Sequence, residues 1–301
     1  MTVTARAPAK VNVHLGVGPL RPDGFHELLT VYLAVSLFDT VTVGPGEGLA
    51  VSLKGEGAGG AVPTDRRNLV WQAAELLAAS AGVPADATIA IAKSIPAAAG
   101  LAGGSADAAA ALVALDELWG TRAARSDLAG LAAQLGSDVP FSLLGGVALG
   151  SGRGEQVSPV LARRPSHWVL GIAGEGLSTP AVYRELDRLR EAGRVPDGIE
   201  LPPTEAVLAA LRDGPPAALA AALTNDLQAP ALSLRPELRR ALRAATDAGA
   251  AAALVSGSGP TVAALVESEE AAVRLAAVLA GEGVFRTVRA VQGPVAGARV
   301  V

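Results

Sequence analysis

Apolar and polar residues alternate near the start of the chain, between Lys10 and Leu15. Strict alternation is typical of a β-strand whose two faces meet different surroundings. The polar face would carry Lys10, Asn12 and His14. A cation beside an amide could bind a phosphoryl group. The alternation alone is equally consistent with an edge strand that has one solvent-exposed face.

The rest of the chain mixes β-branched runs with segments of helical periodicity. Further strands are expected at 29–43, 49–53, 88–92, 145–154, 166–172, 251–255, 261–266 and 287–291. Helices are expected at 68–79, 105–119, 126–135, 204–212, 216–223, 236–248 and 268–280, with another beginning near Ser178. Residues 44–61 are rich in glycine and indicate a hairpin region. The composition changes near residue 155, which predicts two domains, 1–155 and 156–301, in an α+β fold.

A run of small residues leads into the alanine-rich helix. It consists of Pro96, Ala97, Ala98, Ala99, Gly100, Leu101, Ala102, Gly103, Gly104, Ser105 and Ala106. The proline should end the preceding strand, and the glycines permit positive φ or a close backbone approach. Ser105 is the expected N-cap of the helix, and Asp107 would favour the positive end of its dipole.

Free N–H groups at such a helix start bind anions, most often phosphate. A tight strand-to-helix turn without a ligand is the alternative. The run lacks the Gly-Lys-Ser/Thr of a Walker loop, and its glycines do not follow the dinucleotide-binding spacing.

Three further segments place polar or aromatic residues at turns. Phe25 and His26 follow the turn signal Pro-Asp-Gly, where they could stack on a ring and hydrogen-bond it. Asp138 lies in a polar break before Val-Pro, which also suits a helix N-cap. A second glycine turn at 256–260 is, by itself, better explained as a plain hairpin between two strands.

Composition narrows the class of protein. Half of the 301 residues are hydrophobic and 18% are charged, which allows a sizeable core. The net charge of −4 argues against broad nucleic-acid binding, which needs a basic face. The absence of cysteine excludes disulfides, thiolate metal sites and a cysteine nucleophile. No apolar run is typical of a membrane span or a leader, so a cytoplasmic protein is expected.

Three motifs in a fixed order, at 7–12, 96–107 and 256–260, resemble those of the GHMP kinase superfamily, which includes galactokinase, homoserine kinase and mevalonate kinase. Segments 21–28, 135–141 and 225–227 extend the likeness over nearly the whole chain. They bring it closest to members that phosphorylate 4-diphosphocytidyl-2-C-methyl-D-erythritol. The resemblance implies two domains with the active site in the cleft between them. It also implies that the run 96–106 binds ATP, with Mg²⁺ bridging the phosphates.

The resemblance also implies roles for single residues. Asp138 would take the proton from the substrate 2-hydroxyl, while Lys10 would stabilise charge on that oxygen and on the transferring phosphoryl group. The substrate would be held by Asn12, Phe25, His26, Thr179 and Tyr183. Among these, His26 would hydrogen-bond the cytosine, and the two aromatic side chains would sandwich it. Ser105 is a candidate Mg²⁺ contact, and the chain is expected to be a monomer or a weak homodimer.

Two rival functions follow from the same resemblance. A kinase for homoserine or mevalonate is disfavoured by the Phe25–His26 turn, because those substrates have no nucleobase. A non-catalytic nucleotide-binding relative is disfavoured by the presence of both Lys10 and Asp138.

The chain departs from the family pattern in its phosphate loop. Ala98 and Ala102 stand where glycines are usual, and Ala106 stands in place of a serine. Alanine at the first two positions predicts an ordinary, negative φ. Phe25 stands where tyrosine is more usual, which keeps a stacking face and loses a hydroxyl.

Overall fold

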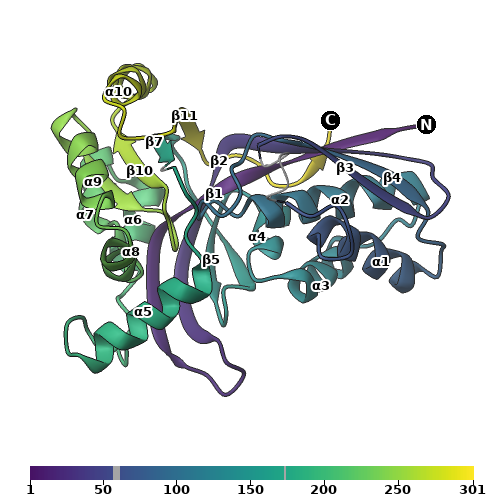
Figure 1. The fold of residues 1–301 in the computed structure, drawn as a ribbon, viewed down its shortest axis with the longest axis horizontal. Helices are drawn as coiled ribbons and strands as arrows, with labels where there is room; N and C mark the ends of the chain where they lie inside the picture. Colours follow the sequence, from purple (N-terminus) through teal and green to yellow (C-terminus); the bar gives the residue numbers. More distant parts are fainter. Residues whose placement is uncertain (57–61, 173) are drawn as a thin grey trace.

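The computed structural model describes residues 1–56, 62–172 and 174–301, and within these the chain forms two β-sheets (Figure 1). The larger sheet has the order β12-β1-β2-β4-β3, with β5 paired to β2 and β6, and β8 paired to β1. Its strands are β1 (Val3–Leu20), β2 (His26–Gly44), β3 (Leu49–Gly55), β4 (Ala87–Lys93), β5 (Val147–Ser151), β6 (Gln156–Val160), β8 (Thr224–Asn225) and β12 (Arg299–Val300).

The smaller sheet has the order β11-β7-β10-β9. Its strands are β7 (Ser166–Ile172), β9 (Ala252–Val255), β10 (Val262–Val266) and β11 (Thr287–Gly293). The chain after residue 155 supplies this sheet, but β6, β8 and β12 return to the larger one. The division of the chain at residue 155 therefore stays a prediction.

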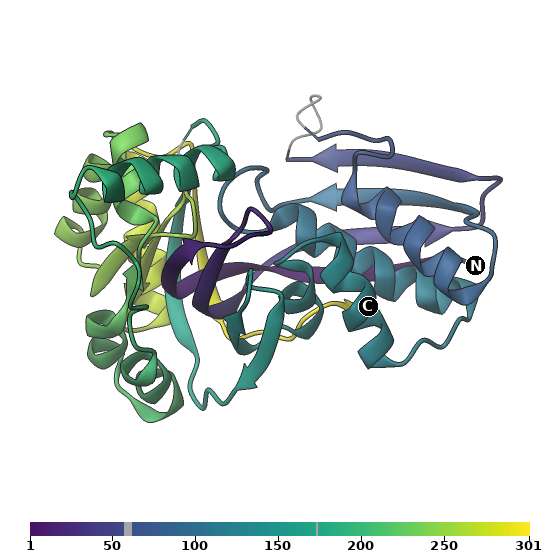
Figure 2. The same ribbon diagram turned by 90° about the horizontal axis from the view of Figure 1, so that it is seen from below.

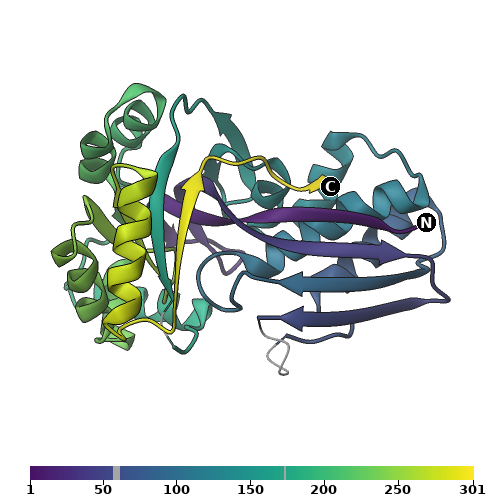
Figure 3. The same cartoon turned by 90° about the horizontal axis from the view of Figure 1, so that it is seen from above.

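One group of helices covers a face of the larger sheet. It consists of α1 (Leu69–Ala81), α2 (Gly103–Trp119), α3 (Arg125–Leu135) and α4 (Val139–Leu144). Figure 2 shows them in front of the strands, and Figure 3 shows the strands from the opposite side. Helix α2 packs directly on β1 and β2, and its alanines from Ala108 to Ala111 are completely buried. Methyl side chains let a helix approach a sheet closely, which explains the alanine-rich sequence.

The remaining helices lie around the smaller sheet, except for the first of them, which lies beside the β1–β2 hairpin (Figure 1). They are α5 (Thr179–Glu191), α6 (Glu205–Asp213), α7 (Pro216–Ala222), α8 (Gln228–Leu234), α9 (Leu238–Asp247) and α10 (Glu269–Gly281). Among the helices that the structure describes, none is both long enough and apolar enough to span a membrane.

Most elements expected from the sequence are confirmed, including the helix that begins after Ser268, whose hydroxyl accepts a hydrogen bond from the Ala271 N–H. The short helix α8 was not expected, while α4 begins after Asp138, where a helix N-cap was one of the two interpretations. The glycine-rich segment 44–61 contains the predicted strand β3, but the prediction of a hairpin is wrong, because β3 pairs in parallel with β4, which lies between it and β2. Residues 57–61 lie outside the described residues.

The prediction of Ser105 as an N-cap is wrong. Helix α2 begins two residues earlier, after Ala102, so Ser105 already lies in its first turn. The neighbouring Asp107 does not act through the helix dipole alone, because its carboxylate contacts Lys93 directly.

The first strand is longer and more central than the alternation between Lys10 and Leu15 predicts. It has 18 residues and lies between β2 and β12, so the interpretation as a wet edge strand is wrong. Its pairing with β2 shifts by one residue between Asn12 and His14. A bulge of this kind reverses the facing of the side chains that follow it.

A buried charge cluster joins β2, β4 and α2. The Lys93 Nζ lies 2.5 Å from Asp39 Oδ2 and 2.6 Å from Asp107 Oδ2, and all three side chains are at most 3% exposed. The other Asp39 oxygen accepts the backbone N–H groups of Ser94 and Ile95. Burial would lower the pKa of Lys93, but the two carboxyl groups outweigh it and raise that pKa. Burial, with Asp39 beside it, raises the pKa of Asp107 well above its usual range.

Replacing Lys93 by methionine should lower the free energy of unfolding by about 3–5 kcal/mol, because it leaves two buried carboxyl groups without their cation. The measurement is urea denaturation. Lys54→Met, on the exposed side of β3, is the matched control and should change stability by less than about 0.5 kcal/mol. Asp107→Asn should cost less than Lys93→Met, because the Lys93–Asp39 pair survives. A loss below about 1 kcal/mol for Lys93→Met would contradict the role of the cluster.

Candidate active site

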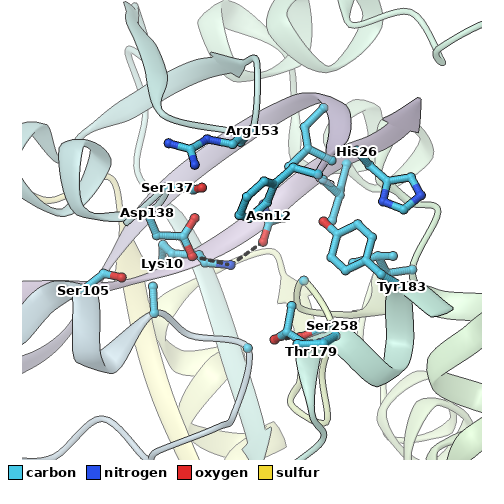
Figure 4. Close-up of a pocket in the computed structure, with 18 of the residues that line it drawn as sticks. Lys10, Asn12, His26, Ser105, Ser137, Asp138, Arg153, Thr179, Tyr183 and Ser258 are labelled. Atoms are coloured by element: carbon cyan, nitrogen blue, oxygen red, sulfur yellow. Dashed lines mark hydrogen bonds and ion pairs between the residues drawn. The ribbon is translucent and has the colours of Figure 1, made fainter. Parts of the chain in front are cut away.

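A cavity of about 700 Å³ lies where elements of both sheets meet (Figure 4). Its walls come from β1, the turn after it, the loop before α2, the start of α4, helix α5 and the turn between β9 and β10. Segments distant in the sequence therefore meet around one space. This is the cleft in which the resemblance placed the active site.

Lys10 and Asp138 face each other in this cavity. The Lys10 Nζ lies 3.8 Å from Asp138 Oδ2 and donates a hydrogen bond of 2.6 Å to Asn12 Oδ1 (Figure 4). The Asn12 amide in turn donates to Thr30 Oγ1 at 2.8 Å, which fixes the direction of its oxygen. Burial lowers the pKa of Lys10, and the Asp138 charge partly opposes that shift. The ammonium is thus held by one charge and one oriented dipole.

Asp138 occupies the N-cap position of α4, as its local sequence suggested, but its side chain makes no capping hydrogen bond. The side chain is 30% exposed and points into the cavity toward Lys10 (Figure 4). The backbone carbonyl instead accepts from Ser142. The carboxylate therefore remains available to a ligand.

His14 does not join Lys10 and Asn12 at the cavity, contrary to the expectation from alternation. The bulge between Asn12 and His14 turns it away, and its Nε2 lies 3.2 Å from the Pro202 carbonyl oxygen. Leu15 lines the cavity in its place.

The loop before α2 adopts a conformation that alanine rarely takes. Ala98 has a φ of 52° and Ala102 a φ of 58°, so the prediction of ordinary φ is wrong at both. The cause is the tight packing of the loop against the β9–β10 turn. Gly100 lies so close to this turn that a Cβ would collide with the Ser256 carbonyl oxygen, and the Ser256 hydroxyl donates to the Gly100 carbonyl. The chain keeps this path even though it imposes αL geometry on two alanines.

The start of α2 is the part of the loop that is predicted to bind an anion. Gly103, Gly104 and Ser105 form its first turn, where backbone N–H groups have no partner within the helix, and all three line the cavity. The Lys10 N–H donates to the Leu101 carbonyl, which joins the loop to β1. The arrangement can hold a phosphate close to Lys10.

The opposite end of the cavity is aromatic. Tyr183 of α5 stacks on the His26 ring with centroids 5.1 Å apart, and His26 Nε2 lies 2.9 Å from Asp187 Oδ1. Phe25 is 49% exposed and carries the Arg153 guanidinium 4.8 Å from its ring centre. Both aromatic residues line the cavity, and the expected sandwich around a cytosine stays a prediction.

Thr179, at the start of α5, contacts the β9–β10 turn through Ser258, with 2.9 Å between the two hydroxyl oxygens. The second glycine turn therefore does more than join two strands. It supports the phosphate loop on one side and α5 on the other, and its Gly257 and Ser258 line the cavity.

Several cavity residues were not found from the sequence. Tyr32 lies within the expected strand 29–43 but stacks on Phe141 of α4, and its ring centre is 5.9 Å from Lys10 Nζ. Burial, followed by the Asp138 charge, raises the pKa of Tyr32 well above its usual range. Arg153 and Asp187 belong to no motif. Only the rarity of tyrosine in the sequence could have drawn attention to Tyr32, because the chain has two tyrosines and both line the cavity.

Comparison with known proteins identifies the superfamily to which the chain belongs. Residues 68–146 match the model of the GHMP kinases N terminal domain, and residues 207–284 match that of the GHMP kinases C terminal domain. The fold agrees, because the crystal structure of a homoserine kinase from Cytophaga hutchinsonii superimposes with a TM-score of 0.77 at 20% identity, covering 100% of this chain and 97% of that one. These are the domains and the fold of a GHMP kinase.

Closer relatives narrow the class. A protein of Nocardia farcinica is 60% identical over 99% of this chain and 96% of its own, and one of Rhodococcus jostii is 59% identical over 99% and 95%. Both are named 4-diphosphocytidyl-2-C-methyl-D-erythritol kinase. A crystal structure of an enzyme of that name has a TM-score of 0.76 at 34% identity, covering 97% of this chain and 98% of that one. The chain belongs to the 4-diphosphocytidyl-2-C-methyl-D-erythritol kinase family.

Replacing Ala98 or Ala102 by glycine should raise the free energy of unfolding by about 0.5–1 kcal/mol. The relief of αL strain exceeds the entropy that glycine adds to the unfolded chain. Thermal or urea unfolding would measure the change. Ala106→Gly is the control in the same segment, since Ala106 lies inside α2, and it should lower stability by roughly 1 kcal/mol. Destabilisation by all three changes would contradict the strain at 98 and 102.

Proposed function

We propose that this protein transfers the γ-phosphoryl group of ATP to the 2-hydroxyl of 4-diphosphocytidyl-2-C-methyl-D-erythritol, a step of non-mevalonate isoprenoid biosynthesis. The relatives at about 60% identity carry that name. The observation that carries the chemistry is the convergence of Lys10 and Asp138 in one cavity, between the phosphate loop and an aromatic end.

Asp138 is the proton acceptor in this proposal. Its carboxylate projects into the cavity without a capping bond, so it can accept the proton of an alcohol that enters beside Lys10. Lys10 stabilises the negative charge that grows on the alcohol oxygen and on the transferred phosphoryl group. Because the ammonium is buried, that stabilisation is stronger than it would be in water.

The loop before α2 supplies the nucleotide phosphate site. Its free N–H groups at the start of α2 and the absence of side chains at Gly103 and Gly104 suit a polyphosphate. A magnesium ion bound with the nucleotide would neutralise phosphate charge, and Ser105, which lines the cavity, would contact it. Among the described residues, no group of three or more His, Cys, Asp or Glu side chains could hold a metal alone, so phosphate oxygens would complete its coordination.

The cytidine end of the substrate fits the aromatic end of the cavity. Phe25, His26 and Tyr183 offer stacking faces and a ring hydrogen bond, and Thr179 lies beside them. Arg153 and Arg184 also line the cavity and can balance the charge of a diphosphate. A substrate without a base would leave this region unfilled, which disfavours homoserine or mevalonate as the acceptor.

The decisive assay measures ADP release with the cytidylyl substrate, homoserine and mevalonate in parallel. We expect turnover with the first only. Asp138→Asn should lower kcat by about 10²- to 10⁴-fold, while nucleotide binding, followed by calorimetry, stays near the wild-type level. Asp127→Asn, in the exposed first turn of α3, is the control and should be fully active. Turnover of homoserine or mevalonate at a comparable rate would refute the assignment.

The pH dependence should report the state of Lys10. If the ammonium form is active, kcat has its full value at pH values below the Lys10 pKa and falls as the pH rises through that pKa. Because burial lowers that pKa, the alkaline decline should fall below the pH at which an ordinary lysine titrates. Lys10→Arg keeps its charge at all accessible pH values, so it should lack this decline even if its kcat is lower. If the Lys10→Arg variant shows the same alkaline decline as the wild type, the decline arises from another titrating group and not from Lys10.

A further inference from the structure

Five residues of α5 line the cavity, and three of them follow one another at intervals of four. These three are Thr179, Tyr183 and Asp187, and residues at this spacing lie above one another on a helix. The first two have roles in the proposed function. Asp187 has none, although it is the charged member of the row and its side chain is only 39% exposed.

Asp187 contacts the His26 ring directly. The ring is buried, stacked on Tyr183, and bound through Nε2 to Asp187 Oδ1 at 2.9 Å. An ionised carboxylate can only accept hydrogen bonds, so the ring must carry its proton on Nε2. In a neutral imidazole the other nitrogen, Nδ1, is then an acceptor.

Asp187 is not needed to attach α5 to the rest of the protein. Arg190, one turn further along, donates to the carbonyl oxygens of Val17 and Gly18 at the end of β1 and to that of Pro196. The helix is thus fixed to the β1–β2 hairpin independently. The contact between Asp187 and His26 can serve the ring itself.

We propose that Asp187 is a positioning residue that fixes His26 as a hydrogen-bond acceptor at Nδ1 and thereby sets the preference for cytosine over uracil. Cytosine carries an amino group at C4, which donates to such an acceptor. Uracil has a carbonyl oxygen at C4, so two hydrogen-bond acceptors, this oxygen and Nδ1, would face each other without a proton between them. The inference rests on the proposed function, because it assumes that the base enters beside His26.

The test compares the wild type with Asp187→Leu, which removes the acceptor at a half-exposed site. One readout is the ratio of kcat/KM for the cytidine- and uridine-diphosphate forms of the substrate. The other is the ratio of dissociation constants for CDP and UDP, which needs no turnover. Both ratios should fall by roughly tenfold, the size expected for one lost hydrogen bond. Glu191→Leu removes a carboxylate from an exposed position of the same helix and should leave them unchanged.

Nitrogen NMR of the imidazole groups reads the tautomer directly, since the chain has three histidines and a His26→Gln spectrum identifies the signals. We expect a protonated Nε2 and an unprotonated Nδ1 in the wild type, and a mixture in Asp187→Leu. Asp187→Asn should retain most of the base preference, because its amide oxygen can still accept from Nε2.

Equal losses for both bases in Asp187→Leu, or a wild-type His26 protonated on Nδ1 alone, would overturn the role of Asp187. A failure of the proposed function looks different. In that case the wild type would not phosphorylate the cytidylyl substrate. The ratio of the dissociation constants for CDP and UDP, together with the NMR spectrum, would still test the role of Asp187.

Discussion

The pairing of Lys93 with Asp107 closes the phosphate loop at its base. Lys93 ends β4 on one side of the loop, and Asp107 lies in α2 on the other. Asp39 binds the same ammonium and holds the first two backbone N–H groups of the loop. Because these charges are out of contact with water, the two ends of the loop can separate only by leaving buried charge unpaired, which is costly. The strained alanines further along are tolerated because both ends are fixed in this way.

The same constraint determines where chemistry can occur. The loop touches β1 through Lys10 and the β9–β10 turn through Gly100, so its position sets the distance between the two sheets at the cavity. Lys10, whose N–H donates to the loop, is supplied by the larger sheet, and Asp138 by the start of α4. The site therefore draws its residues from elements around both sheets.

The sequence predicted the parts of this site that depend on local patterns. Lys10 and Asn12 were found because a short strand places alternate residues on one face, and the loop was found because glycines gather where a helix begins. His14 was misplaced because a one-residue bulge leaves no trace in the alternation. The backbone of Ala98 and Ala102 was misjudged because tertiary packing against residues 256–259 overrides the preference of alanine. Tyr32 and Asp187 lie in ordinary-looking segments, and only the folded chain brings them to the cavity.

The two-residue strand β12 has a consequence for how the molecule is made. It pairs Ala5 and Arg6 with Arg299 and Val300, almost the full length of the chain apart. The larger sheet, although β1 is its first strand, is therefore completed only after residues 299 and 300 have been synthesised. Contacts of such long sequence separation close large loops and slow the search for the native topology. Until then, Ala5 and Arg6 of β1 lack this partner, and unpaired strand edges can pair with other chains.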